Sequence, residues 1–366
     1  MCKNNLLFGF ILFYFIFSFK ITFAQPENYP FQISTTFNDS IRGDHTFRIV
    51  FWNVENLFDT KDDPITADEA FTPDGENHWT MFRFKEKIKN LSKTLLSTGG
   101  WEPTDFIGLC EIENREVLEA LVNFTPLKDK EYQIIHEDSN DPRGIDVAAM
   151  YRPQKFNLIN YEYIRLKFPF SPEGRTRDIL YARGILPNND TLHIFVNHFP
   201  SRYGGQFETD PKRQYAAKIL REMADSLMAI NSNASILVMG DFNDHPDDKS
   251  MKEVLGAKLT QQGLAKNDLY NLMAPMQYKF GTHSFEGKWG VLDQFIVSSA
   301  LFEGRGRSKI REAKIYDAPW LIKLNAQGNT TSNRMYQGPQ YLGGYADHLP
   351  ILLDIDLKKN DPIKKD

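Results

Sequence analysis

VMGDFNDHP, at positions 238–246, is the stretch that decides how this chain is interpreted. The apolar residues 235–239 predict a short buried strand, which runs straight into Gly240 and Asp241. Asp241 therefore lies at a strand end, where it can take a proton from an attacking water molecule, and the amide of Asn243 can orient that water. The alternative is an Asp-Asn turn that only ends the strand.

Five further polar clusters end apolar runs in the same way. They are FWNVEN (51–56), LCEIEN (109–114), VNHFPSR (196–202), LDQFIVS (292–298) and ADHLP (346–350). Buried strands favour apolar residues, so carboxylates and histidines placed repeatedly at strand ends predict one shared catalytic rim. These side chains are the ones that metal-assisted cleavage of a phosphate ester requires.

The intervening residues alternate between strand-like and helix-like segments. A helix is expected over 83–97, with its lysines on the face opposite the apolar one, and a short helix over 117–122. A third helix is expected to begin at Asp210, because aspartate suits the cap and Pro211 the first turn. Strands are expected over 48–52, 106–110, 132–136, 147–151, 156–165, 179–186, 192–197, 235–239, 292–297 and 351–355. This pattern predicts an α/β fold with two packed sheets covered by helices, and two long loops, 57–82 and 314–345.

The two ends of the chain are expected to lie outside the fold. Lys3, the apolar run 6–19 and Thr-Phe-Ala before Gln25 indicate a signal peptide over 1–24, and hence a secreted or periplasmic protein. An uncleaved anchor is the alternative, although about 14 apolar residues fall short of the roughly 20 that span a bilayer. Residues 25–45 read as a linker or N-terminal arm, 46–357 as one catalytic domain, and 358–366 as a disordered tail.

Charge and cysteine content limit the possible partners. Without residues 1–24 the chain has 41 basic and 48 acidic residues, a net charge of −7, so its overall field does not attract polyanions. Bound cations and a few arginines must offset the repulsion if the substrate is a phosphate polymer. Only Cys110 remains, which excludes an internal disulfide, and no obligate protein partner is evident.

Three carboxylates are candidates for binding a hard divalent cation. Glu111 and Glu55 are the first choices, with Asp347 nearby, because such ions prefer oxygen ligands and because crowded carboxylates are costly without a cation. The alternative is that Glu111 caps the following helix and Glu55 is simply exposed.

Histidines and an arginine complete the predicted site. His348 follows Asp347 directly, and Asp293 opens another strand, so an Asp–His pair can keep the imidazole protonated and stabilise a leaving oxygen. His198 in VNHFPSR is a second histidine of this kind. Arg177 can bind a phosphate through its planar guanidinium or make a surface ion pair.

These clusters, in this order, resemble the endonuclease/exonuclease/phosphatase superfamily, which includes deoxyribonuclease I-like and exonuclease III-like enzymes. The resemblance covers about residues 47–356 and suggests an exported bacterial-type member. It implies a four-layered α/β sandwich of two packed, mostly antiparallel mixed sheets flanked by helices. It also implies dependence on Mg²⁺ or Mn²⁺, with the site at one edge of the two sheets.

The resemblance also implies a role for each matching residue. Glu111 resembles the principal metal ligand, Asp347 its neighbour, and Glu55 stands where some members have an aspartate ligand. Asn53 resembles the residue that positions the aspartate or the phosphate, and Asp241 and Asn243 resemble the pair that activates and orients the water. Asp293 resembles the aspartate that holds the catalytic histidine, here His348. His198 and Arg177 resemble residues that contact the phosphate.

A nuclease is the first functional hypothesis. VNHFPSRYGG resembles extracellular nucleases, and Arg202, Lys212 and Arg213 can contact a nucleic-acid backbone or form an ordinary solvated surface. A phosphodiesterase or phosphatase acting on a lipid headgroup or a small phosphoester is the alternative, indicated by aromatic residues at Phe168, Phe170 and 319–322. A binding module without catalysis is the third possibility.

Overall fold

The computed structural model describes residues 42–43 and 45–358. The expected signal peptide (1–24), most of the expected arm (25–45) and residues 359–366 of the expected tail lie outside the described residues. Arg42, near the end of that arm, contacts the domain: its guanidinium lies 3.2 Å from Asp105 Oδ2 and donates to the carbonyl oxygens of Glu102 and Pro103.

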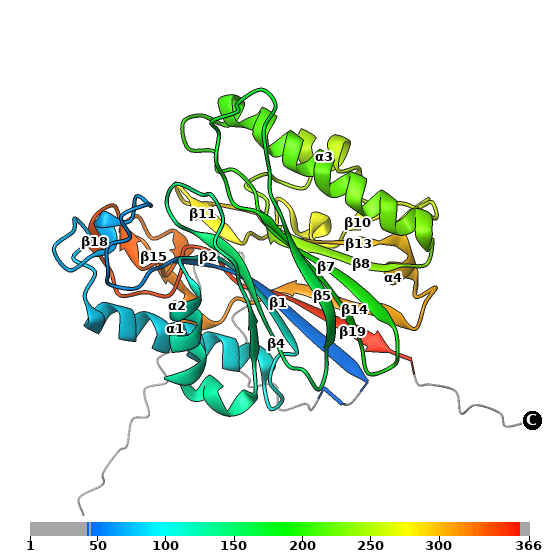
Figure 1. Ribbon diagram of the computed structural model, residues 1–366, viewed down its shortest axis with the longest axis horizontal. Coiled ribbons are helices and arrows are strands. Elements are labelled where there is room, and N and C mark those ends of the chain that lie inside the picture. Colours follow the sequence, from blue (N-terminus) through cyan, green and yellow to red (C-terminus); the bar gives the residue numbers. More distant parts are fainter. Residues whose placement is uncertain (1–41, 44, 359–366) are drawn as a thin grey trace, which may run out of the picture.

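Two sheets form the centre of the molecule (Figure 1). In spatial order, the first contains β14 (Ser308–Ile315), β19 (Ile351–Leu357), β1 (Thr46–Leu57), β2 (Phe106–Ile112), β4 (Asp146–Tyr151) and β3 (Gln133–Ile135). The second contains β5 (Asn157–Ile164), β6 (Ile179–Ile185), β7 (Thr191–His198), β8 (Ser235–Asp241), β13 (Asp293–Ser298), β10 (Leu269–Asn271) and β9 (Ala257–Lys258). Most neighbours are antiparallel, but β1 pairs with β2, β7 with β8, and β9 with β10 in parallel.

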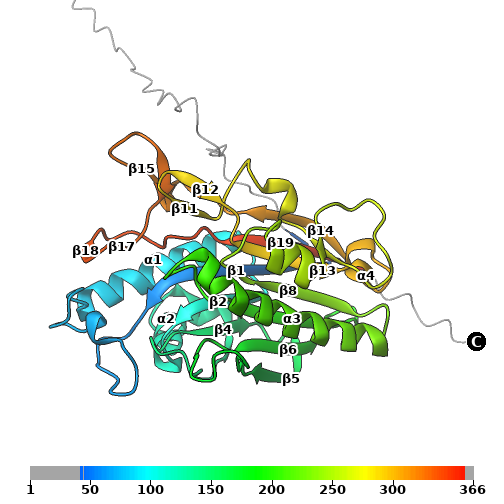
Figure 2. The same ribbon diagram turned by 90° about the horizontal axis from the view of Figure 1, so that it is seen from above.

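Helices cover the outer faces of the two sheets, which gives four layers (Figures 1 and 2). The helices α1 (Met81–Gly99) and α2 (Arg115–Asn123) pack on the first sheet, and α3 (Gln206–Ile230) packs on the second. The inner faces meet in an apolar core, where a Cβ atom at Gly108 would come within 2.5 Å of Met239 Cε. The predicted four-layered α/β sandwich is therefore confirmed.

Short elements fill the connections. They are the helix α4 (Ser299–Glu303), the 3₁₀ turns Glu69–Phe71, Pro126–Lys130, Ala274–Met276 and Pro319–Leu321, the π turn Ser250–Val254, and the small hairpins β11–β12 (His283–Phe285, Lys288–Gly290), β15–β16 (Ile322–Leu324, Thr330–Ser332) and β17–β18 (Tyr336–Gln337, Gln340–Tyr341). The expected long loop 314–345 thus contains two hairpins and a 3₁₀ turn. Strands of two or three residues are too short to show a period of two in the sequence.

The helix α3 begins at Gln206, four residues before the expected start at Asp210. Pro211 therefore lies inside the helix, where it cannot donate a hydrogen bond to the preceding turn. The side chain of Arg213 adds two hydrogen bonds to this first turn, to the carbonyl oxygen of Gln206 at 2.9 Å and to Thr209 Oγ1 at 2.7 Å.

The aromatic segments that suggested a lipid surface are mostly packed. Phe168 is buried, and Leu321 and Ile322 belong to the core between α1 and the first sheet, whereas Phe170 is exposed. Within the described residues no helix is long and apolar enough to cross a membrane. Cys110 is a buried free thiol.

Candidate active site

Strand ends from both sheets meet at one edge of the sandwich. In the second sheet, Asp241 at the end of β8 pairs directly with His198 on β7 and with Asp293 on β13. In the first sheet, Asn53 on β1 pairs with Cys110, the residue before Glu111 on β2. A hydrogen bond from Asn53 Nδ2 to Asp241 Oδ2, 3.0 Å long, joins the two sheets at this edge.

Asp241 lies at the centre of this arrangement. Its Oδ1 accepts the backbone N–H of Asn243 at 2.9 Å, and its Oδ2 lies 3.7 Å from the Nε2 atoms of both His198 and His348. Burial raises the pKa of Asp241 to about 6, opposed by His348 and reinforced by Asp293. A carboxylate so placed can exchange a proton near neutral pH.

His348 is held by Asp293. The two groups share a hydrogen bond of 2.7 Å between His348 Nδ1 and Asp293 Oδ2. Burial alone would lower the pKa of His348, but the charges of Asp293 and Asp241 raise it well above its ordinary value. The imidazole is therefore charged near neutral pH, and its Nε2–H is directed to the region beside Asp241.

The pKa of His198 is shifted in the opposite direction. Burial lowers its pKa well below the ordinary value, and the charges of Arg177, Arg143 and His348 lower it further. The two histidines on either side of Asp241 thus differ in charge: His198 is neutral and His348 is protonated. Such a separation of properties is typical of sites where one group accepts and another donates a proton.

Arg177 is buried and already has partners. Its NH1 lies 3.1 Å from Asp141 Oδ2, and its NH2 donates to the carbonyl oxygen of Phe199 at 2.7 Å, which also accepts from Asn243 Nδ2 at 3.1 Å. Of the two roles left open by the sequence, an ion pair is the one formed here, although it is buried. Arg177 therefore fixes Phe199, the residue that directly follows His198 at the end of β7.

Glu111 is oriented by the first strand. Its Oε1 accepts from Asn53 Nδ2 at 3.3 Å, and its Oε2 accepts the backbone N–H of Asn56 at 2.9 Å. The backbone is left-handed at Glu55, Asn56 and Glu111, with φ of 54°, 55° and 63°, and at Asn243, with φ of 52°. Such backbone is unfavourable for these residue types and often marks functional sites.

Glu55 is buried beside the site and is not exposed, which was the alternative to a ligand role. Its Oε2 accepts the backbone N–H of Met335 at 2.7 Å and its Oε1 that of Tyr336 at 3.3 Å, so the carboxylate holds the start of β17. Burial raises its pKa to about 7, and Asp347 raises it as well, whereas Lys87 lowers it. Both oxygens of Glu55 thus have donors within the protein, as do both oxygens of Glu111.

Asp347 lies beside Arg334, whose NH2 is 3.1 Å from its Oδ2. Burial tends to raise its pKa, but His348, His283 and Arg334 together lower it, so the group stays ionised. Glu111 and Asp241 accept from the same amide, Asn53 Nδ2, and the charges of Glu111 and Asp347 both act on Lys87. Ligand atoms within 4.8 Å of one another occur here in two groups, His283–Asp347–His348 and Asp241–Asp293–His348. A hard divalent cation prefers carboxylate oxygens and would offset the charge of these buried carboxylates.

Three residues at the site were not predicted. Lys87 is buried on the apolar face of α1, so the expectation that the lysines lie on the other face is wrong for this residue. Lys87 donates to the carbonyl oxygen of Tyr345 at 2.7 Å, and burial lowers its pKa to about 8. A lysine one position before Ile88 was a detectable signal, because it interrupts an apolar stripe. His283, whose ring is 4.6 Å from that of His348, and Arg334 come from short hairpin segments that carry no such signal.

Two arginines proposed as nucleic-acid contacts form ion pairs with the segment after β8. Arg213 on α3 is fully buried with its Nε 2.8 Å from Asp244 Oδ1, which corrects its proposed surface role. Arg202 contacts Asp244 at 3.1 Å and Asp248 at 2.6 Å, and its side chain is 27% exposed. Lys212 remains partly exposed.

Solved structures resemble this fold at low sequence identity. They include a humanized TDP2 from D. rerio (15% identity, 86% of this chain and 100% of that chain, TM-score 0.52) and the catalytic domain of human Nocturnin (16% identity, 86% and 94%, 0.52). A third is a mannosyl-6-phosphatase from Bacteroides thetaiotaomicron (14% identity, 84% and 99%, 0.52). No curated protein matches the chain in sequence. The profile of the Endonuclease/Exonuclease/phosphatase family matches residues 48–357, so the chain belongs to this family of phosphoester hydrolases.

Proposed function

We propose that this protein is a metal-dependent phosphoesterase that cleaves nucleic-acid phosphodiesters by attack of an Asp241-activated water. The observation that supports this most directly is the environment of Asp241: one oxygen 3.0 Å from Asn53 Nδ2 and 3.7 Å from two imidazole nitrogens. Its pKa of about 6 suits a group that takes a proton near neutral pH.

Each neighbouring residue has a part in the proposed reaction. Asn53 and the N–H of Asn243 orient the carboxylate of Asp241 toward water. His348, charged and fixed by Asp293, donates through Nε2 to a phosphate oxygen that gains charge in the transition state. Neutral His198 contacts another phosphate oxygen, and buried Arg177 holds the backbone that carries it.

Glu111 and Asp347 would hold the cation, Mg²⁺ or Mn²⁺. When bound, such an ion neutralises the phosphate and stabilises the leaving oxygen. In this proposal Glu55 supports Asp347 through the 334–336 segment instead of binding the ion directly.

A lipid headgroup or small phosphoester is the second candidate. The observation that favours it is the segment 334–336, which Glu55 fixes beside the site and which brings Arg334 next to Asp347. A fixed cation there suits a terminal phosphate with two negative charges. One solved neighbour is named as a mannosyl-6-phosphatase, which keeps a sugar phosphate among the compounds to assay.

A substrate panel tests both candidates. Purified protein with Mg²⁺ or Mn²⁺ is incubated with plasmid, linear and single-stranded DNA, RNA, sphingomyelin, inositol phosphates, mannose 6-phosphate and bis(p-nitrophenyl) phosphate. Asp241→Asn is expected to lose about 10²–10⁴-fold of any genuine activity. Asp129→Asn, at an exposed position, is the matched control and should keep full activity.

The outcomes separate the hypotheses. DNA or RNA cleavage that Asp241→Asn abolishes supports the nuclease. Turnover of only lipid or small phosphoesters supports the second candidate. Binding of these compounds without turnover, with either metal, would leave the non-catalytic module.

We also propose that the catalytic domain covers residues 46–357, that the protein acts outside the cytoplasm after cleavage near residue 24, and that it needs no protein partner. Mass analysis of the N-terminus of protein recovered from the expressing cells and from their medium tests the cleavage. An intact N-terminus in the cytoplasmic fraction alone would contradict it.

A further inference from the structure

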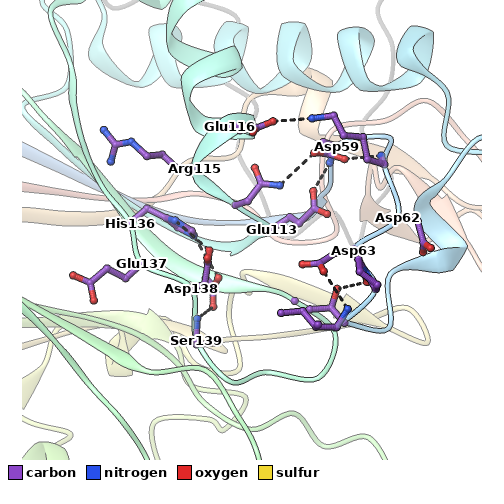
Figure 3. Close-up of a pocket in the computed structure, with 17 residues that line it drawn as sticks. Asp59, Asp62, Asp63, Glu113, Arg115, Glu116, His136, Glu137, Asp138 and Ser139 are labelled. Carbon is purple, nitrogen blue, oxygen red and sulfur yellow. Dashed lines mark hydrogen bonds and ion pairs between the residues drawn. The ribbon is translucent and has the colours of Figure 1, made fainter.

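A second group of potential metal ligands lies in an acidic cavity beside the proposed catalytic centre. The cavity, of about 610 Å³, is enclosed by the segments 59–66, 113–116 and 136–146 (Figure 3). Acidic side chains outnumber basic ones among its lining: Asp59, Asp62, Asp63, Glu113, Glu116, Glu137, Asp138 and Asp146 face only Lys61, Arg115 and His136. A cavity of this composition favours a cation over a phosphate.

The side chain of His136 is 2% exposed, yet its Nε2 has no hydrogen-bond partner. The nearest carboxylate oxygen, Asp146 Oδ2, lies 3.4 Å away without the geometry of a hydrogen bond. Buried imidazole nitrogens are normally satisfied. An orphaned nitrogen directed toward a buried carboxylate therefore indicates that something belongs between the two groups.

The carboxylate of Asp146 is already oriented for a ligand. Its Oδ1 accepts the backbone N–H of Ser139 at 2.9 Å, which leaves Oδ2 directed toward His136. Asp138 has its Oδ1 3.9 Å from His136 Nδ1, and its side chain is largely exposed, so it can turn toward an ion bound between His136 and Asp146. Ligand atoms of the three residues all fall within 4.8 Å of one another.

We propose that His136, Asp146 and Asp138 bind a divalent transition-metal ion, with Zn²⁺ the best match. Two ligand atoms at ordinary Zn²⁺ distances and a tetrahedral angle are about 3.3 Å apart, close to the 3.4 Å between His136 Nε2 and Asp146 Oδ2. Imidazole nitrogen with two carboxylates favours Zn²⁺ or Mn²⁺ over Mg²⁺, which prefers oxygen and water alone. Water from the cavity completes the coordination.

This site is separate from the catalytic ligands and shares no residue with them. It can nevertheless influence them, because the segment 136–146 also carries Asp141, the partner of buried Arg177. Arg143 on the same segment donates to Asn56 Oδ1 at 2.7 Å, next to the strand end that carries Asn53. A bound ion would fix both ends of this segment and so stabilise one wall of the catalytic rim.

Metal binding by the full chain tests the proposal without reference to activity. Zn²⁺ titration by calorimetry and visible absorption with Co²⁺, both in excess Mg²⁺, are measured for four proteins: wild type, His136→Gln, Glu111→Gln and the double variant. We expect one Zn²⁺ bound in wild type and in Glu111→Gln, and at least about tenfold weaker binding in both proteins that carry His136→Gln. Tetrahedral Co²⁺ absorption should follow the same pattern.

Two further variants distinguish the loss of a metal ligand from a general folding defect. Asp146→Asn keeps an oxygen to accept from Ser139 but loses the charge, and should also weaken Zn²⁺ binding at least about tenfold. His45→Gln, at an exposed histidine, should bind Zn²⁺ as wild type does. Equal Zn²⁺ binding by Glu111→Gln and by the double variant, with both folded by circular dichroism, would overturn the proposal in favour of a plain His–Asp pair.

Discussion

Replacement of Arg213 by methionine should destabilise the protein without directly affecting substrate binding. Arg213 is fully buried and contacts Asp244, Thr209 and the carbonyl oxygen of Gln206. Breaking a buried ion pair typically costs about 3–5 kcal/mol. In the variant Asp244 would still contact Ser250 Oγ at 2.6 Å and Arg202 at 3.1 Å, and methionine would retain the apolar packing of the arginine stem. We therefore expect the free energy of unfolding to fall by about 3 kcal/mol, the lower end of this range.

Urea unfolding followed by tryptophan fluorescence measures this loss. With a slope of about 3 kcal/mol per molar urea, the midpoint should fall by about 1 M and the slope should stay unchanged. Lys212→Met is the matched control: the neighbouring lysine is partly exposed, 5.7 Å from the ring of Phe168, and its loss should change stability by under about 0.5 kcal/mol.

A double-mutant cycle with Asp244→Asn identifies the cause. If the pair is responsible, the second substitution should cost less in the Arg213→Met background than in wild type. The reasoning is refuted if Arg213→Met unfolds within about 1 kcal/mol of wild type, or if it weakens DNA binding and lowers its salt dependence while stability is unchanged.

Four further outcomes are expected. Asp293→Asn should lower kcat about a hundredfold with little change in KM, because His348 loses the charged acceptor at 2.7 Å; an unchanged kcat would exclude this role. Glu55→Gln loses the charge that holds the amides of Met335 and Tyr336, so trypsin should cleave faster after Arg334, with no change after the distant Arg311. Burial lowers the pKa of His193 to about 4, so on acidification the unfolded chain takes up this proton at a higher pH than the folded protein does. The contribution of His193 to the free energy of unfolding should therefore be fully present above about pH 6.5 and fall by on the order of 2 kcal/mol toward pH 4. His193→Phe should remove this loss. Chelation with EDTA should abolish hydrolysis, and Mg²⁺ or Mn²⁺ should restore it; activity that persists in EDTA would contradict a metal requirement.

The sandwich was predictable because its strands are long apolar runs that end in polar residues. The runs before Asp241 and before Glu111 are read directly from the sequence, and their parallel partners place those ends at one edge. Asn53 follows the same rule, whereas Asp293 and His348 reach Asp241 because Asp293 begins β13 and His348 precedes β19, antiparallel strands whose starts lie at this edge. Here a local pattern and the tertiary arrangement agree.

What the sequence did not predict depends on contacts between distant segments. Glu55 meets residues 335–336, about 280 positions away, and no local pattern indicates this pairing. The first turn of α3 is bonded to the side chain of Arg213, a buried contact that no cap pattern indicates. The hairpin that carries His283 is only three residues long on each side. In each case a tertiary contact outweighs the local preference.

Glu55, Asn56, Glu111 and Asn243 all keep side chains where the backbone is left-handed. Asparagine tolerates this conformation, so the strain falls mainly on the two glutamates, at roughly 1 kcal/mol or more each. Glu55 offsets its strain by holding the amides of Met335 and Tyr336, which is a structural task that glycine would lose. In our proposal Glu111 is kept for the cation instead. Glycine in place of Glu111 would then mark members of the family that keep the sandwich but have lost hydrolysis.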